Sequence, residues 1–369
     1  MLRSVFFLLL LFIAVRALPQ NTDGVIAGKE TVLTIPPGPD NPRNSEGDFI
    51  TLKSGKILYI YSHFTGSTFM DDDPAYLASR FSTDNGKTWS KTDEVVVRHE
   101  GRGNLMSVSL LRLHNGQIAL FYVKKNSSWD CIPWMQLSDD EAKSWHAPVR
   151  CITDEEGYFV VNNNRVIQLK NGRLLMPVSK HDVKEGGEWN KDSEMGRIFC
   201  YFSDDNGETW SRGDEVPNPD HVLHQEPGVV QLSNGNIFMV IRSDANAQYV
   251  SYSADNGKSW TPSKISDIYS PVSPASIARA PHSRTLVLVW NNNHGDNPLI
   301  KGMRTPLTIA ISKNNGRTWN NKKNIEDNPH GSFCYSAIHF SRNSILLGYF
   351  DWSTRQITIK RLSRQWVYK

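Results

Sequence analysis

The stretch Ser82-Thr83-Asp84-Asn85-Gly86-Lys87-Thr88-Trp89 decides how this chain folds, because it recurs along the sequence. The pattern returns at 203–210 and 253–260, and at 312–319 with Asn in place of Asp. A degraded copy with Ala in place of Gly occupies 138–145. An Asp or Asn side chain bonds its own backbone in a turn, Gly supplies a positive φ, and Trp packs on a neighbouring layer. Copies spaced 50–65 residues apart indicate one repeated structural unit.

A second repeat alternates with the first and consists of an apolar strand, a tight turn and another apolar strand. Its turns are Ser54-Gly55, Asn115-Gly116, Asn171-Gly172 and Asn234-Gly235, with weaker equivalents at His282-Ser283 and Arg342-Asn343. Each unit therefore holds a hairpin, a third strand that runs into the Ser-x-Asp turn, and a fourth strand. This pattern predicts an all-β fold, a six-bladed β-propeller with four-stranded antiparallel blades, in which radial closure protects the sheet edges. A long β-solenoid is the rival architecture, but solenoid repeats are shorter.

The N-terminus carries the marks of a targeting segment. Arg3 precedes an apolar run from Val5 to Val15, and small residues follow at a candidate cleavage site ending in Ala17. The run is too short to span a bilayer. We therefore expect a signal peptide at 1–17 and a single propeller domain at 18–369, secreted or, in a bacterium, periplasmic.

Charge and cysteine content narrow the possible partners. The net charge is +3 and no basic stripe occurs, which argues against nucleic acid as a partner. The sequence contains no second apolar run, so no membrane span is expected. The four cysteines fit no zinc motif, so no metal is expected, and they allow three disulfide pairings between which the sequence does not choose. They are Cys131, Cys151, Cys200 and Cys334.

Polar residues gather where the meander of strands brings chain segments to the end opposite the repeated turns. Glu226 opens an inner strand, Arg242 ends the next strand, and Arg304 precedes a strand in the following unit. Tyr335 opens the last inner strand and Arg43 precedes the first. The same end receives Gln225, the loop residues Asp71, Asp72 and Asp73, and the run Asn162, Asn163, Asn164 and Arg165. Alone, each has an ordinary explanation such as a surface ion pair, but buried Arg and Glu near one axis need partners or ligands.

These stretches resemble the catalytic signatures of exo-α-sialidases, in the sialidase (neuraminidase) superfamily, whose repeated turns are called Asp boxes or BNR repeats. That family places a Glu at the start of an apolar strand and an Arg at the end of the next, which Glu226 and Arg242 match. Arg304 before an Asp box and Tyr335-Ser336 in the last unit match further signatures. Arg43 is followed by Asn44 instead of the family's usual Ile-Pro, which indicates a divergent branch.

The resemblance implies a retaining hydrolase for a terminal acidic 2-keto sugar, most simply sialic acid on a glycan. Arg43, Arg242 and Arg304 would hold the sugar carboxylate, because guanidinium forks bind carboxylates bidentately. Tyr335 would be the nucleophile and Glu226 its base, and their side chains are expected within hydrogen-bond reach. Asp71, or alternatively Asp73, would act as acid and base, with Arg165 and Gln225 also contacting substrate. No cofactor is needed.

Two other classes stay open at this point. One is an enzyme for a related ulosonic acid such as KDN or Kdo, which hydrolyses or transfers it. The other is a propeller that binds glycans without catalysis, for which the Tyr335 and Glu226 pair would not be needed.

Overall fold

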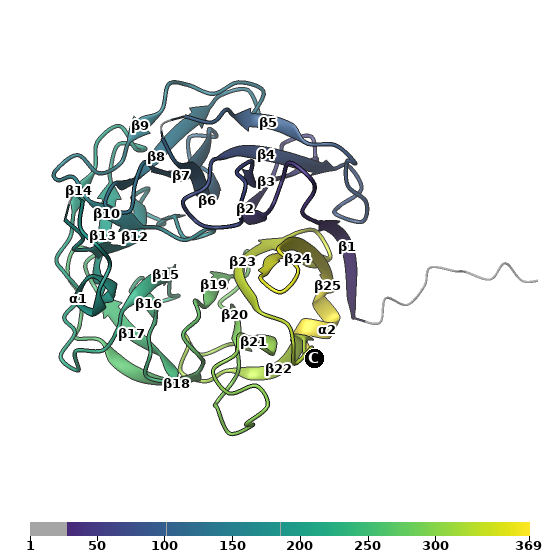
Figure 1. The fold of residues 1–369 in the computed structure, drawn as a ribbon. Coiled ribbons are helices and arrows are strands. Elements are labelled where there is room, and N and C mark those ends of the chain that lie inside the picture. The colour runs from purple at the N-terminus through teal and green to yellow at the C-terminus, as the bar shows by residue number, and fades with distance from the viewer. Residues whose placement is uncertain (1–27, 101, 185) are drawn as a thin grey trace, which may run out of the picture.

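The computed structural model describes residues 28–369 apart from 101 and 185, so the predicted signal peptide at 1–17 lies outside the described residues. The described chain consists mostly of β-strands, with two short helices, α1 (Lys191–Glu194) and α2 (Arg364–Tyr368). In Figure 1 the sheets stand around a common centre, with β2, β6, β15, β19 and β23 innermost and β1, β5, β9, β14, β18 and β22 outermost.

Half of the ring is one continuous sheet of 13 strands. Its first antiparallel stretch comprises β2 (Asn44–Thr51), β3 (Ile57–Phe64), β4 (Ala75–Ser82) and β5 (Glu94–Val97). The second comprises β6 (Asn104–Arg112), β7 (Ile118–Lys125), β8 (Cys131–Ser138) and β9 (Val149–Arg150). The third comprises β10 (Tyr158–Val160), β11 (Ile167–Gln168), β12 (Leu174–His181), β13 (Arg197–Ser203) and β14 (Ser211–Arg212). Single parallel pairings, Ala75 with Asn104 and Tyr158 with Cys131, join the three stretches.

Three separate four-stranded antiparallel sheets complete the ring. The first comprises β15 (Gln225–Gln231), β16 (Ile237–Arg242), β17 (Ala247–Ser253) and β18 (Lys264–Tyr269). The second comprises β19 (Ser276–Arg279), β20 (Leu286–Asn291), β21 (Leu307–Ser312) and β22 (Asn320–Glu326). The third comprises β23 (Phe333–Phe340), β24 (Ser344–Asp351), β25 (Gln356–Ser363) and the N-terminal β1 (Lys29–Ile35), which pairs with β25. The all-β class and the four-stranded antiparallel sheets are thus confirmed.

The Asp boxes have the turn chemistry predicted for them. Asp84 Oδ1 accepts hydrogen bonds from the Lys87 and Thr88 amides at 3.0 and 2.9 Å, and the Gly86 amide donates to Ser82 Oγ at 2.9 Å. Each box serine pairs with the residue that opens the preceding strand, for example Ser82 with Ile57, so hairpin turns and Asp boxes share one end of the sheets. The other pairs are Ser138 with Ile118, Ser203 with Leu174, Ser253 with Ile237 and Ser312 with Leu286.

The core lies between successive stretches of the ring, because central strands such as β7 and β20 bury side chains on both of their faces. The box tryptophan contributes to this packing: the rings of Trp210 and Phe121 meet edge to face, with centroids 6.0 Å apart. All four cysteines are buried and unpaired, so none of the three possible disulfide pairings forms in the structure. Among the described residues, no helix is both long and apolar enough to cross a membrane.

Candidate active site

Four inner strands share an irregularity at the end opposite the Asp boxes. The register of β2, β6, β15 and β23 shifts at two-residue bulges. The first bulge residue has a positive φ in each case: 56° at Glu46, 63° at Ser107, 44° at Glu226 and 55° at Tyr335. A non-glycine residue rarely adopts this conformation, and a bulge redirects the side chain that it carries. All four side chains line one cavity.

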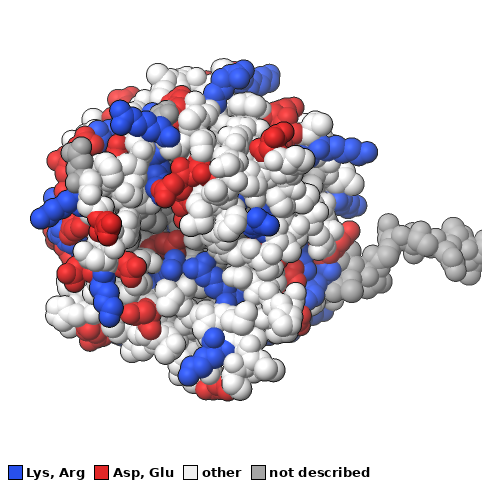
Figure 2. All heavy atoms as spheres, viewed as in Figure 1, with Lys and Arg blue, Asp and Glu red and all other residues white. Residues whose placement is uncertain are grey.

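This axial cavity has a volume of about 260 Å³ and lies where the inner strands approach one another. Figure 2 shows acidic and basic atoms side by side in a hollow near the centre of this face. Besides the four bulge residues, the cavity is lined by charged and polar residues from separate sheets and by apolar residues from β6–β8 and β10. These include Asp71, Arg242, Arg304, Asn162, Tyr158, Met106, Val123 and Cys131. Tyr335, Glu226, Asp71, Arg242 and Arg304, which are far apart in the sequence, therefore share one cavity.

Glu226 and Arg242 form an ion pair at the wall of the cavity. Arg242 Nη1 lies 2.5 Å from Glu226 Oε2, and both side chains are largely buried. The pairing of Gln225 with Arg242 across β15 and β16 fixes this geometry, since Glu226 follows directly. The Gln225 side chain itself donates to the carbonyl of Glu194 at 3.0 Å and does not line the cavity.

Arg43 lies behind the cavity wall and does not line the cavity. Its side chain is fully buried, and its Nη1 bonds to Asp71 and to the carbonyl of Phe69. Its Nη2 donates to Ser45 Oγ at 3.1 Å and to Glu46 Oε1 at 3.3 Å. Three aromatic rings surround the guanidinium at 4.5–5.0 Å, those of Phe64, Phe350 and Trp352. In this arrangement Arg43 holds two carboxylates of its own chain.

The three adjacent aspartates have different surroundings. Only Asp71 lines the cavity; burial acts to raise its pKa, but the charge and hydrogen bond of Arg43 lower that pKa below its ordinary value. Asp72 pairs with Lys125 at 2.8 Å. Asp73 accepts hydrogen bonds from the Thr68 amide and hydroxyl at 2.6 and 2.7 Å, which stabilise the loop. The geometry therefore favours Asp71 over Asp73 as the acid–base residue.

Tyr335 faces the same cavity as Glu226, but their expected hydrogen bond is not among the contacts of the described residues. The Glu226 carboxylate bonds to Arg242 instead. Burial and the nearby negative charge of Glu226 raise the pKa of Tyr335 well above its ordinary value. The guanidinium of Arg304 lies 5.9 Å from the Tyr335 ring centroid. The tyrosine is thus a neutral hydroxyl between an acidic and a basic group.

The residues at 162–165 brace the inner strands. Asn163 Nδ2 donates to the carbonyls of Gly47 at 2.8 Å and Tyr335 at 3.1 Å, so it ties two bulges together. Arg165 is buried outside the cavity and donates to Ser276 Oγ at 3.1 Å. Burial lowers the pKa of Arg165 to about 10, although acidic residues nearby oppose the shift.

Sequence reasoning missed the two bulge residues Glu46 and Ser107, and it also missed Tyr158 of β10. Glu46 lies in the polar run from Asn44 to Asp48 that opens a strand, and this run was the available signal. No comparable signal marks Ser107 in the sequence. The bulge that turns each side chain inward appears only in the strand pairing.

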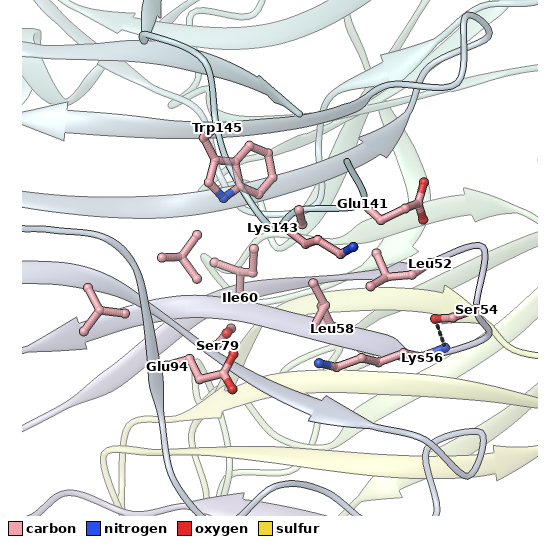
Figure 3. Close-up of a pocket in the computed structure, with 13 residues that line it drawn as sticks. Leu52, Ser54, Lys56, Leu58, Ile60, Ser79, Glu94, Glu141, Lys143 and Trp145 are labelled. Atoms are coloured by element: carbon pink, nitrogen blue, oxygen red, sulfur yellow. Dashed lines mark hydrogen bonds between the residues drawn. The ribbon is translucent and has the colours of Figure 1, made fainter. Parts of the chain in front are cut away.

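A larger cavity, about 630 Å³, lies at the Asp-box end between β3–β5 and the box at 138–145 (Figure 3). Figure 3 shows Trp145 on one side of this space and Lys56 and Glu94 on the other. None of the four bulge residues lines it, and its Glu141 is occupied by Arg112, with two contacts of 2.8 Å. The axial cavity, which gathers the predicted catalytic groups, is therefore the candidate active site.

Comparisons with known proteins show which family and fold the chain shares. A family model described as a BNR repeat-like domain matches residues 64–350. A sialidase of Clostridium perfringens is 29% identical over 230 residues, which cover 54% of this chain and 55% of that protein. The chain spans about half the length of the curated sialidases that it matches.

Solved structures with the same fold include a Trypanosoma rangeli sialidase in complex with the inhibitor DANA. It has a TM-score of 0.67 and 17% identity, with 90% of this chain and 59% of that chain covered. A Dyadobacter fermentans protein of unknown function has a TM-score of 0.70 and 18% identity, with 91% of this chain and all of that chain covered. At these identities the likeness establishes a shared fold.

Proposed function

The chain belongs to the BNR repeat-like domain family, within the sialidase superfamily, and from this premise we propose that it is a retaining exo-glycosidase for a terminal acidic 2-keto sugar. Sialic acid on a glycan is the first candidate substrate. We further propose that the sheets form six blades, three from the separate sheets and three from the 13-stranded sheet, and that the protein is exported.

One observation carries the proposal: Tyr335, Glu226, Asp71, Arg242 and Arg304 reach one cavity from four different sheets or loops. Two arginines suit a carboxylate ligand, and a neutral tyrosine suits attack at a carbon that bears a carboxylate, since that carboxylate repels an anionic nucleophile.

In the proposed reaction the sugar carboxylate binds Arg242 and Arg304. This ligand competes with Glu226 for Arg242 and so frees the Glu226 carboxylate to take the proton of Tyr335. The Tyr335 oxygen attacks the anomeric carbon while an acid protonates the leaving oxygen. Asp71, held by Arg43, then activates the water that releases the sugar from the tyrosine. The lowered pKa of Asp71 suits this base step, and the acid step requires Asp71 to carry a proton, which it regains from the water that it activates.

The test is turnover of fluorogenic α-ketosides of sialic acid, KDN and Kdo by the purified full chain. Hydrolysis of the sialoside with net retention of anomeric configuration supports the proposal. Hydrolysis of only the KDN or Kdo compound would reassign the sugar. Binding of all three without turnover would overturn the enzymatic function and leave a glycan-binding protein.

A further inference from the structure

Glu46 is a carboxyl group of the axial cavity that the proposed reaction does not use. It is the bulge residue of β2, and only 4% of its surface is exposed. Its Oε2 accepts the Ser107 hydroxyl at 2.5 Å and its Oε1 accepts Arg43 Nη2 at 3.3 Å. Both terminal nitrogens of Arg43 are therefore taken by groups of this chain, since Nη1 bonds to Asp71. The Glu46 carboxyl stands between this arginine and any ligand in the cavity.

The charges that act most on Glu46 include one positive group, Arg43, and two negative groups, Asp71 and Glu226. Arg43 beside it is shared with Asp71, and Glu226 contributes a second negative charge. Burial, opposed by the charge of Arg43, raises the pKa of Glu46 to about 7. The titratable groups that interact with it are Arg43, Asp71, Cys131, Tyr158, Arg165, Glu226 and Tyr335. Arg242 and Arg304 line the same cavity and add positive charge there.

The hydrogen-bond partner of Glu46 suits both protonation states. The Ser107 hydroxyl can donate to the carboxylate or to the carbonyl oxygen that the neutral acid keeps, so this hydrogen bond persists when Oε1 is protonated. The contact from Arg43 Nη2 at 3.3 Å is long, so its loss in the neutral state has a small cost. Neutral Glu46 then carries one O–H that can be donated into the cavity.

We propose that Glu46 determines by its protonation whether the cavity accepts an acidic sugar. In the neutral state its O–H donates to the ligand carboxylate, beside Arg242 and Arg304. In the ionised state its charge repels that carboxylate and Arg43 stays occupied. The proposal rests on the acidic-sugar specificity inferred above and adds a specificity-determining residue to it.

The sign of the pH dependence follows from linkage. If only protonated Glu46 admits the anion, Kd is constant at acidic pH and rises about tenfold per pH unit above about 7. A ligand whose carboxylate is esterified carries no negative charge for ionised Glu46 to repel, so its affinity should change far less with pH. The comparison of the two ligands needs only the wild-type chain.

The experiment is calorimetric titration of the full chain with DANA and with the methyl ester of DANA, between about pH 5.5 and about pH 8.5. For DANA we expect Kd to rise at least about tenfold over this range, and for the ester to stay within about twofold. In Glu46→Gln the amide cannot ionise, so the DANA profile should become flat. Glu94→Gln, a change of an exposed carboxylate in the cavity of Figure 3, is the matched control and should keep the wild-type slope.

The outcomes separate this proposal from the proposed function. A flat DANA profile in the wild type, or an unchanged slope in a folded Glu46→Gln, would overturn the role of Glu46 and leave the enzyme assignment standing. An unchanged slope would place the titration at another group, such as buried Asp48, whose pKa burial also raises to about 7. Tight binding of the ester and none of DANA at any pH would overturn the acidic-sugar specificity itself.

Discussion

The Asp boxes and the axial cavity use the same unusual backbone conformation for different purposes. In four of the five boxes asparagine occupies one position at positive φ, 59–64°, namely 85, 206, 256 and 315, and the degraded box has Glu141 there at 65°. Asparagine tolerates this conformation because its side chain bonds locally. At the bulges the residues are Glu46, Ser107, Glu226 and Tyr335, which have nothing in common except the cavity.

This difference separates structural strain from functional strain. A turn that recurs along the chain selects the residue best suited to its conformation, so the same type returns in most copies. A bulge that aims a side chain at a ligand selects for the side chain, and the surrounding structure holds the backbone in place. Changes at the bulges should therefore affect chemistry and binding, whereas changes in the boxes should affect stability.

The largest effect should come from Tyr335→Phe, which removes only the nucleophilic oxygen. We expect turnover of a fluorogenic sialoside to fall on the order of 10³-fold or more, while the Kd for DANA changes little. A fluorinated sialic acid that traps the covalent intermediate should label Tyr335 of the wild type in mass spectrometry. Tyr252→Phe in β17, outside the axial cavity, is the control and should keep full activity. Undiminished turnover in Tyr335→Phe would remove this residue from the mechanism.

A smaller effect should follow from two arginine-to-lysine variants, one at the cavity end of the sheets and one at the Asp-box end. Arg242→Lys keeps the charge but loses bidentate binding, so DANA should bind about 10–100-fold more weakly. Arg173 at the Asp-box end makes a bidentate pair with Asp204, with contacts of 2.7 and 2.6 Å. Arg173→Lys should lower stability in urea unfolding and leave DANA binding unchanged. The opposite pattern in the two variants would contradict the division of roles.

The repeats made one end of the molecule predictable from sequence and left the other end partly hidden. The Asp boxes, the hairpin turns and their common end follow from local turn chemistry, which a short stretch such as Ser82–Trp89 contains in full. The gathering of Tyr335, Glu226 and Arg242 followed from strand direction alone. Glu46 could not be predicted, because a bulge is defined by the pairing of two strands and the sequence of one strand does not show it.

Three further differences arise from long-range contacts. The sheet of β23–β25 takes its fourth strand from the N-terminus, since β1 pairs with β25. Arg43 was expected in the carboxylate clamp but is engaged by Asp71 and Glu46, and the expected Tyr335–Glu226 contact is replaced by Glu226–Arg242. The last two differences depend on which of several charged side chains pair with one another inside the cavity region. Spacing along the chain does not determine that pairing.

Within the Asp boxes, Asp84→Ala should lower the unfolding free energy by about 1–2 kcal/mol through the loss of several hydrogen bonds. Asp84→Asn should cost much less, because Asn314 accepts the Thr318 amide at 3.0 Å in the box at 312–319. Urea unfolding measures both, and activity per folded molecule should stay unchanged. Lost turnover in well-folded Asp84→Ala would show that the box also serves the cavity.

The contribution of Asp84 to folding stability should also depend on pH. Burial acts to raise its pKa, but hydrogen bonds from Thr88 and Ser82 lower the pKa to about 2, below its unfolded value near ~3.9. Its contribution to stability is therefore present above about pH 4 and is lost as the pH falls towards about 2. Asp84→Asn removes this dependence, so the stabilities of wild type and variant should converge in acid.

The smallest effect concerns the degraded box, where Ala142 has a φ of 62° at the position that glycine occupies in the other boxes. An alanine in the left-handed region is strained, whereas glycine is not, but glycine also costs more entropy on folding and gives up the packing of one methyl group. The balance should make Ala142→Gly more stable by a few tenths to about 1 kcal/mol, seen as a Tm rise of about 1–3 °C. The reverse change, Gly86→Ala, introduces the same strain and a Cβ only 2.7 Å from Leu346 Cδ2, so it should lower Tm by more than the first variant raises it. If Ala142→Gly lowered Tm instead, the alanine would be required for packing against its neighbouring sheet, and the recurrence of glycine in the other boxes would reflect fit to the neighbour as much as backbone conformation.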